Sequence, residues 1–175
     1  MQLTAMASVD DETFLLDLLN STPIVDGAQR DDLATAQTGR AWLQAHGHGG
    51  SVGEWRAARV ARVLLQDVVR GAQPATALAP QLGRASYRAE ATDAGVQWHL
   101  DTPADQAAAV RAVLAWDAVH RTRPGRLRPC ENDECALFLI DRSKPNKARW
   151  CSMAVCGNRL KARRHYERTR AVTSE

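Results

Sequence analysis

Residues 130–156 of the chain read CENDECALFLIDRSKPNKARWCSMAVC, and this stretch contains every cysteine of the protein. The cysteines form two pairs of equal spacing, Cys130-x4-Cys135 and Cys151-x4-Cys156, with fifteen residues between the pairs. Two close pairs joined by a short ribbon are typical of a tetrahedral zinc site with four thiolate ligands. Such a site has no coordination position open for water, so it stabilises a fold and does not hydrolyse a substrate. We therefore predict one structural Zn²⁺ ion bound by all four cysteines.

The spacing within each pair restricts the local structure. In a regular α-helix, two residues five positions apart differ by about 140° around the axis, so neither pair can lie wholly within one. We expect Cys151 to lie just before a helix and Cys156 in its first turns, with Ser152 as the N-cap. Cys130 and Cys135 are expected in a turn, because asparagine and aspartate, both turn formers, lie between them.

The segment between the two pairs reads as the strands of a hairpin. Residues 136–140 form an apolar run typical of a strand, 141–146 read as a turn, and 147–150 return the chain to the second pair. The predicted unit is thus a β-hairpin followed by a helix. It has few apolar residues of its own, so zinc binding is expected to supply much of its folding free energy.

Other cysteine chemistries fit the pattern less well. Two disulfides require an oxidising compartment, and the first residues, MQLTAMASVDDE, lack the basic start and apolar run of a secretory signal. Redox-active cysteines usually occur as C-x-x-C, which the chain lacks. An iron–sulfur cluster remains as an alternative with the same ligand type. No apolar stretch is long enough to span a membrane, and we expect a cytoplasmic protein with no membrane partner.

Charge is distributed unevenly along the chain. Residues 1–120 carry nine basic and fourteen acidic side chains, a net charge of −5, whereas residues 121–175 carry fourteen basic and six acidic ones, a net charge of +8. An acidic body joined to a basic, cysteine-bearing end suggests a polyanionic partner for the basic part, and we expect DNA. The alternative is a solvated basic tail that packs against the acidic body.

The most basic segment follows the last cysteine. On a helix, residues 159, 163, 166 and 170 fall on one stripe, and a helix of this charge can approach phosphates. The start of the helix is the best candidate for contacts with base edges. The predicted nucleic-acid-binding residues are Asn158, Arg159, Lys161, Arg163, Arg164, Tyr166 and Arg170.

The rest of the chain has the periodicity of a mainly α-helical protein with one short β-hairpin. Three tryptophans, Trp42, Trp55 and Trp116, fall on apolar helix faces and are expected in the core. We expect three parts: a helical domain over residues 1–120, a basic linker over 121–129 and the zinc unit over 130–175. The predicted elements are helices at 10–20, 31–45, 52–70 and 101–120, a short helix near 75–82, and strands at 84–91 and 96–100.

The residues Cys156-Gly157-Asn158-Arg159 carry a resemblance to a family of bacterial zinc fingers, the CGNR fingers. The resemblance extends over roughly residues 125–170 and includes the first cysteine pair, residues 138–143 and residues 149–153. Residues 14–22 and 32–35 are similar to the helical domain that usually precedes this finger, named ABATE and labelled a stress-induced transcription regulator. The resemblance implies a helical body with a small β element, a C-terminal zinc finger and a role in transcription.

The combined expectation is a bacterial DNA-binding transcription regulator, not an enzyme, because phosphate-binding loops and hydrolase motifs are absent from the sequence. Two alternatives remain. The finger could dock on an acidic protein partner, or the helical domain could bind a ligand or catalyse a reaction beside a purely structural finger. A ligand pocket would be expected near Asn20 and Asp32. A homodimer and a small-molecule effector are further expected partners.

Overall fold

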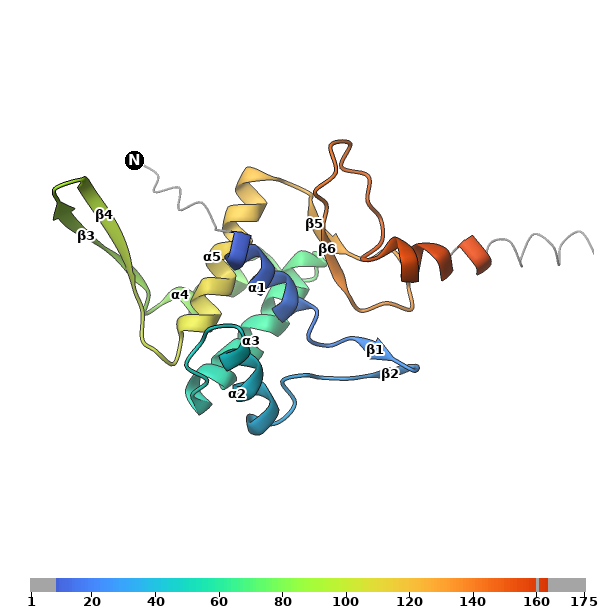
Figure 1. The fold of residues 1–175 in the computed structure, drawn as a ribbon, viewed down its shortest axis with the longest axis horizontal. Coiled ribbons are helices and arrows are strands. Elements are labelled where there is room, and N and C mark those ends of the chain that lie inside the picture. Colours follow the sequence, from blue (N-terminus) through green and yellow to red (C-terminus); the bar gives the residue numbers. More distant parts are fainter. Residues whose placement is uncertain (1–8, 160, 164–175) are drawn as a thin grey trace, which may run out of the picture.

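The structure is a computed structural model that describes residues 9–159 and 161–163. A body of helices occupies the centre, one long hairpin projects from one end, and the cysteine-bearing region lies at the other end (Figure 1). No helix in the described ranges is long and apolar enough to cross a membrane. The elements in chain order are α1 (Val9–Leu19), β1 (Ile24–Val25), β2 (Ala28–Gln29), α2 (Ala36–Ala45), α3 (Val52–Val69), the 3₁₀ helix η1 (Ala75–Leu78), α4 (Ala79–Leu82), β3 (Ser86–Thr92), β4 (Gly95–Asp101), α5 (Ala107–Thr122), β5 (Leu127–Pro129), β6 (Phe138–Ile140) and the π-helix η2 (Met153–Gly157).

The mainly α-helical prediction is confirmed, and two of the long helices start later than expected. Helix α2 begins at Ala36 instead of residue 31, because Asp31 folds back to accept the Leu33 amide at 2.8 Å and Thr35 forms the N-cap. Helix α5 begins at Ala107 instead of residue 101, since Asp101 still pairs with Ser86 in the β3–β4 ladder. The helices predicted at 10–20 and 52–70 correspond to α1 and α3.

A hairpin that was not predicted follows α1. Strands β1 and β2 pair through Val25 and Ala28, and the two residues between them, Asp26 and Gly27, have positive φ angles of 51° and 79°. Two successive positive φ angles define the type I′ turn, for which Asp-Gly is a favoured sequence. The signal was therefore present in the chain, but the flanking strands are only two residues long and give no alternating pattern.

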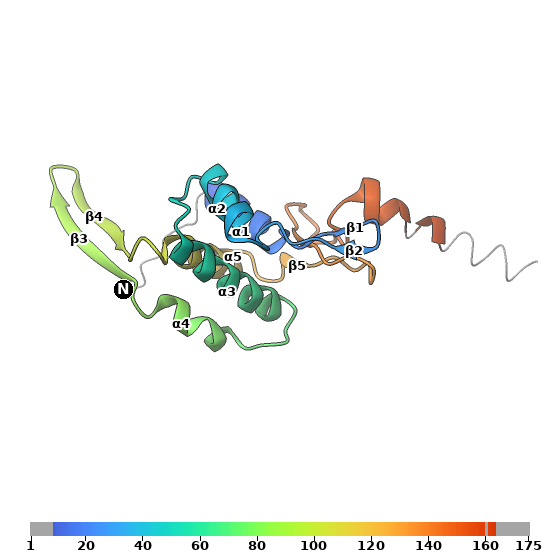
Figure 2. The same ribbon diagram turned by 90° about the horizontal axis from the view of Figure 1, so that it is seen from below.

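The core lies where α1, α3 and α5 pack together (Figure 2). Helix α1 contributes large side chains, and α5 contributes small ones, so the two helix backbones can approach closely. The three tryptophans expected in the core pack against this cluster while remaining partly exposed, and Trp55 also donates its indole N–H to the Leu33 carbonyl at 2.9 Å. The buried side chains include Phe14, Leu15, Leu18, Leu19, Leu33, Leu43, Leu65, Ala108, Ala112 and Val113.

The C-terminal region is anchored in this core through β6. The ring of Phe138 is 1% exposed and belongs to the same apolar cluster, and the Arg70 guanidinium lies 4.6 Å from its centroid. The Asn20 amide binds the backbone of Phe138 on both sides, accepting its N–H at 2.7 Å and donating to its carbonyl at 3.2 Å. Two residues separated by 118 positions thus join the end of α1 to the region that carries the cysteines.

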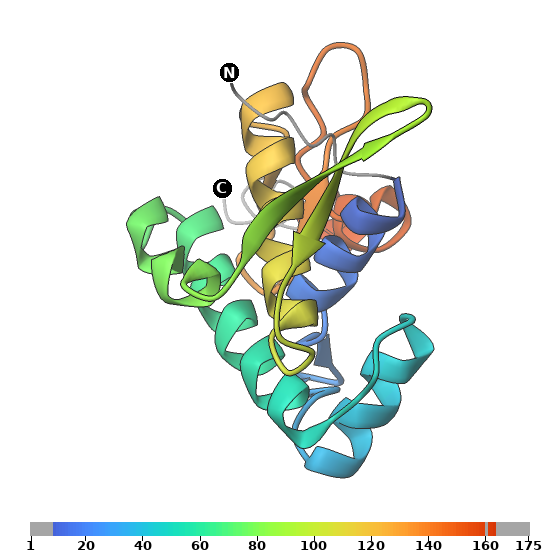
Figure 3. The ribbon, with the colours of Figure 1, turned by 90° about the vertical axis from the view of Figure 1, so that its left-hand side faces the viewer.

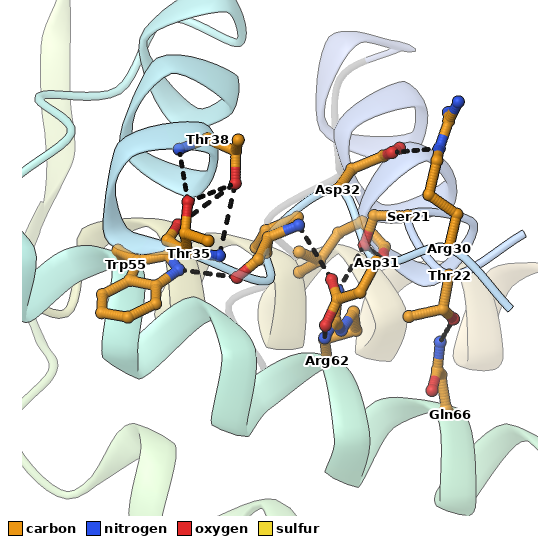
Figure 4. A network of polar contacts seen from close by, with 12 residues as sticks. Ser21, Thr22, Arg30, Asp31, Asp32, Thr35, Thr38, Trp55, Arg62 and Gln66 are labelled. Carbon is orange, nitrogen blue, oxygen red and sulfur yellow. Dashed lines mark hydrogen bonds and ion pairs between the residues drawn. The ribbon is translucent and has the colours of Figure 1, made fainter.

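A buried polar network fixes the segment after α1 against α3 (Figure 4). Arg62 is 4% exposed and forms a two-pronged ion pair with Asp31, with N···O distances of 2.6 and 2.8 Å, and it also donates to the Ser21 hydroxyl at 3.0 Å. One turn later, Gln66 donates to the Leu19 carbonyl and the Thr22 hydroxyl. The hydrogen bond from Arg62 is the main reason that the pKa of Asp31 lies below its usual range.

Replacing Arg62 by methionine is expected to lower the free energy of unfolding by about 1–3 kcal/mol at pH 7, because Asp31 and Ser21 lose their donor. A carboxyl whose pKa is depressed on folding stabilises the fold above its unfolded pKa, and this contribution disappears as the pH falls through the folded pKa. The difference in the free energy of unfolding between wild type and variant should therefore become smaller below about pH 4. Urea denaturation across this pH range measures it.

The matched control is Arg30→Met. Arg30 also pairs with an aspartate, Asp32, at 2.9 Å, but its side chain is 63% exposed, so its loss should cost under about 1 kcal/mol. Equal effects of the two substitutions would show that the buried network does not hold the segment in place.

Candidate metal centre and its basic surroundings

The four cysteine sulfurs meet in one cluster. All four Sγ atoms lie within 4.8 Å of one another, and the distances are 3.8 Å from Cys135 to Cys151 and 3.6 Å from Cys151 to Cys156. Four Zn–S bonds of about 2.3 Å in a tetrahedron place the sulfurs about 3.8 Å apart. None of the thiols is in a disulfide, which would need a sulfur separation of about 2.05 Å. The cluster therefore has the size and donor set of a tetrathiolate zinc site.

The second cysteine pair is brought together by a wide helical turn. Cys151 precedes η2 and Cys156 lies within it, as the spacing predicts. Ser152 is the N-cap and accepts the Val155 amide, while its carbonyl accepts Gly157 N–H at 3.0 Å, five residues on. This i→i+5 bond defines a π-helix, which is wider than an α-helix and returns residues five apart to one side. The helix after the second pair thus begins as a π-turn, where an ordinary helix start was expected.

Gly157, directly after Cys156, leaves room for the side chain of Met153. A Cβ atom at Gly157 would lie 2.9 Å from the Met153 sulfur and 3.1 Å from its terminal methyl, too close for an ordinary contact. The absence of a side chain lets Met153 fold across the π-turn. Cys156 and Gly157 are both buried, whereas Met153 remains exposed.

Two N–H groups point at the sulfurs and would stabilise thiolates. The Cys151 amide donates to Cys130 Sγ at 3.4 Å, and the Asn132 amide donates to Cys156 Sγ at 3.5 Å. Asn132 is 1% exposed and was predicted only as a turn former, so its role toward the metal is a functional contribution that sequence reasoning missed. Donors of this kind orient metal ligands and tune their basicity.

Burial and the closeness of the four thiols shift their pKa values. Burial raises the pKa of Cys135 to about 11, and burial together with the neighbouring thiols raises that of Cys151 further. Burial also acts against ionisation of Cys156, but hydrogen bonds from Asn132 and the other cysteines lower its pKa. A divalent cation removes this conflict, because it displaces the thiol protons and neutralises the charge. The four cysteines form a site for one structural zinc ion, and they fill its coordination sphere.

Strand pairing beside the site differs from the prediction. The expected hairpin of residues 136–140 with 147–150 does not form, because β6 pairs with β5, which lies before the first cysteine, in the register Leu127↔Ile140 and Pro129↔Phe138. The residues expected as a linker, 121–129, therefore contain the end of α5 and a strand. The first cysteine pair lies between β5 and β6 in the chain, and the second pair follows the loop after β6.

That loop is organised by a buried carboxylate. Asp141 is 2% exposed and accepts the Ser143 and Ala148 amides, each at 2.8 Å, and the Arg128 guanidinium at 2.7 Å. The bonds from Ser143, followed by those from Ala148 and Arg128, lower the pKa of Asp141 to about 2. The carboxylate therefore stays charged and holds both ends of the loop that leads to Cys151.

Most arginines near the end of α5 serve the fold. Arg123 and Arg142 both pair with Glu12 of α1, and Arg121 pairs with Asp117. Arg126 donates to the carbonyls of residues 141 and 143. Their charge is thus largely matched by the acidic body or by backbone acceptors. The exposed basic side chains of the loop after β6 are Arg142, Lys144, Lys147 and Arg149.

The structure describes four of the seven predicted nucleic-acid-binding residues. Asn158 donates to the Ala154 carbonyl at 3.3 Å, and Arg163 pairs with Asp133 at 3.3 Å, beside Glu134. Arg159 and Lys161 are exposed, and Arg159 also borders a small cavity next to Cys135 and Cys151. Arg164, Tyr166 and Arg170 lie outside the described residues.

The two residues predicted to mark a ligand pocket have separate roles. Asn20 uses both ends of its amide on the backbone of Phe138, as described above. Asp32 pairs with Arg30 near the surface, and its backbone N–H donates to the Ser21 carbonyl at 2.9 Å. A pocket beside them stays a prediction.

The fold and the cluster together define a mainly helical body joined to a small four-cysteine zinc-binding unit. Residues 126–169 match the CGNR zinc finger family. The match covers the end of the chain only, and it includes all four cysteines and the basic segment that follows. No curated protein matches the chain.

Replacing Cys151 by serine is expected to abolish stoichiometric zinc binding, since three thiolates no longer close the site. The control is Ser152→Ala, which removes only the N-cap and should cost about 1 kcal/mol of stability while one zinc is retained. Metal content by elemental analysis of the purified, reduced proteins measures this. Full zinc occupancy in the cysteine variant would contradict the assignment of ligands.

Asn132→Ala is expected to weaken zinc affinity by about 10–100-fold, because Cys156 loses a hydrogen-bond donor. Asn158→Ala is the matched control, since its amide contacts a backbone carbonyl and no sulfur. Competition with a chromophoric chelator compares the two. An unchanged affinity in Asn132→Ala would show that this contact does not tune the site.

Proposed function

We propose that this chain is a non-enzymatic DNA-binding transcription regulator whose zinc unit presents a basic helix to the phosphate backbone. The carrying observation is that the zinc cluster fixes the start of this helix, with Arg159 and Lys161 exposed directly after Cys156. A closed tetrathiolate site supplies rigidity and no chemistry, so the finger contributes through the side chains that it positions.

The distribution of charge supports the same proposal. Acidic side chains pair with the arginines near the body and with two arginines of the loop after β6, Arg142 and Arg149. The exposed lysines of that loop are Lys144 and Lys147, and the helix after η2 exposes Arg159 and Lys161. Clustering of lysine and arginine on one part of a protein is the electrostatic feature of nucleic-acid binding. Asn158 and Arg159 are the best-placed residues for base edges, since they lie at the start of the helix.

The proposal extends to the helical body and its partners. The similarity of residues 14–22 and 32–35 to the ABATE domain supports a sensory or dimerising role in transcription. A cavity of about 330 Å³ between the C-terminal ends of α3 and α5 borders Leu127 of β5, and its walls include Trp116, His120 and Arg123. It lies where the body joins the finger, and we assign it as the site for a small-molecule effector.

The alternative is a finger that docks on an acidic protein. One observation favours it: Arg163 pairs with two carboxylates of the first cysteine turn, so this face binds carboxylates within the chain itself. A purely structural finger beside a ligand-binding or catalytic body is the third possibility. Removing basic side chains of the finger separates these three functions: it should weaken DNA binding in the first, weaken binding to an acidic protein in the second, and affect neither in the third.

The double substitution Arg159→Ala/Arg163→Ala is expected to weaken binding to a duplex of about 30 base pairs roughly tenfold and to reduce the slope of log K against log salt by about 2. The control is Arg30→Ala/Arg84→Ala, two exposed arginines of the body. Fluorescence anisotropy across a salt series measures both. If the wild-type protein binds no DNA, or binds it with no salt dependence, the proposal is wrong; loss of binding to an acidic protein alone would favour docking.

A further inference from the structure

The β3–β4 hairpin is an arm that projects from the helical body (Figures 1–3). Its strands pair over seven positions, from Ser86↔Asp101 to Thr92↔Gly95. Side chains opposite each other in such a ladder share a face. One face is polar and carries the Glu90–His99 ion pair. The residues of the other face are all apolar or aromatic: Tyr87, Ala89, Ala91, Val96, Trp98 and Leu100.

Exposure of this apolar face increases toward the tip. Tyr87, at the base, is half-buried, and burial together with the charges of Asp11 and Asp117 raises its pKa. Beyond the base, Leu100 is 38% exposed, Trp98 41% and Val96 63%. An isolated two-stranded hairpin is only marginally stable in water, and an exposed apolar face of this kind marks a contact surface.

The tip of the arm carries an exposed carboxylate, Asp93. Residues 89–100 contain two acidic side chains, Glu90 and Asp93, and no lysine or arginine. Glu90 is paired with His99 at 3.0 Å and with Arg88 at 3.8 Å, whereas Asp93 lies at the tip turn between β3 and β4. The arm therefore combines an apolar face with a negative end, and a nucleic acid does not fit it. The surface that fits must be apolar with positive charge beside it.

Helix α3 carries such a surface. Val60 and Val63 are 52% and 51% exposed, and they line an open hollow of about 580 Å³ that is bordered by Arg56 and Arg59. The Arg59 guanidinium lies 5.3 Å from the ring centroid of Trp55, which holds it along the helix surface. The apolar stripe and the two cations complement the apolar face of the arm and the carboxylate of Asp93 at its tip.

The base of the arm and the hollow are neighbours in one molecule. A Cβ atom at Gly53, in the first turn of α3, would lie only 2.8 Å from the Asp105 Cβ, and Asp105 follows β4 by four residues. A two-fold axis near this point would bring each arm over the α3 of the other copy. We propose that a second copy of this chain covers both surfaces, in a symmetric dimer with exchanged arms.

The size of the contact explains why both arms are needed. Seven strand residues span about 24 Å, and two strands with their side chains are about 10 Å wide. One arm and its receiving surface then bury about 480 Å², below the size of a stable interface, whereas two reciprocal contacts approach about 1,000 Å². The dimer does not depend on DNA binding, so either proposal can fail without the other.

Trp98→Lys tests the apolar face, and Gln97→Lys is the matched control, because the adjacent residue points to the opposite, polar face. Sedimentation equilibrium of the full, zinc-loaded chain without DNA is expected to give twice 19.2 kDa for wild type and Gln97→Lys at about 10 μM. The mass of Trp98→Lys should be 19.2 kDa. Val63→Lys, on the receiving helix, should have the same effect, with at least about a tenfold weaker dimer.

Charge reversal tests which surfaces meet. Asp93→Arg alone and Arg56→Glu/Arg59→Glu alone should each weaken the dimer, whereas the triple variant should regain at least part of the loss. Circular dichroism and zinc content establish that each variant is folded. A monomeric wild type at about 100 μM, a Trp98→Lys variant that dimerises like wild type, or a triple variant weaker than both parents would overturn the proposal.

Discussion

Four sulfur atoms that must share one ion set the geometry of the C-terminal third of this protein. The turn after β5 is mostly polar, and the apolar side chains of the π-turn, Met153 and Val155, are exposed, so apolar packing does little to hold the two turns together. The sulfurs alone repel as thiolates. A divalent cation converts that repulsion into the strongest local attraction in the region. The direction of the basic helix follows from it, since the helix continues from the turn that carries Cys156.

Contacts with the helical body also hold the metal-binding region in place. Phe138 lies in the common core, and Asn20 binds its backbone from the end of α1. These contacts hold β6, the strand between the two cysteine pairs, in place without help from the metal. Glu12 adds a second link through Arg123 and Arg142. The acidic body thus pairs with part of the positive charge near the junction, and Arg159 and Lys161 farther out are exposed.

The sequence was most informative where the determinants are local. The cysteine spacing excludes a regular helix and indicates zinc, and periodicity located α1 and α3 within a residue or two. Predictions from local sequence were wrong where a residue far away in the chain determines the local structure. Asp31 looks like the start of a helix, yet its bond to Arg62 keeps it in the preceding loop. Strand β5 has a basic, proline-containing sequence and becomes a strand only because β6 pairs with it.

The same limit applied to the site. All four ligands could be read from their spacing, but the contact from Asn132 to Cys156 joins residues 24 positions apart. Asn132 has the sequence context of an ordinary turn residue, and only the fold places its amide at a sulfur. The receiving hollow on α3 was hidden for a related reason: Val60 and Val63 match the helical apolar pattern but lie on the outer side of the helix.

X-ray absorption at the zinc edge of the full chain measures the central interaction directly. Four sulfur neighbours at about 2.3 Å, with no nitrogen or oxygen ligand, are predicted. A first shell with fewer sulfurs, or one completed by water or histidine, would contradict the closed site on which this account of the finger and its basic helix is built.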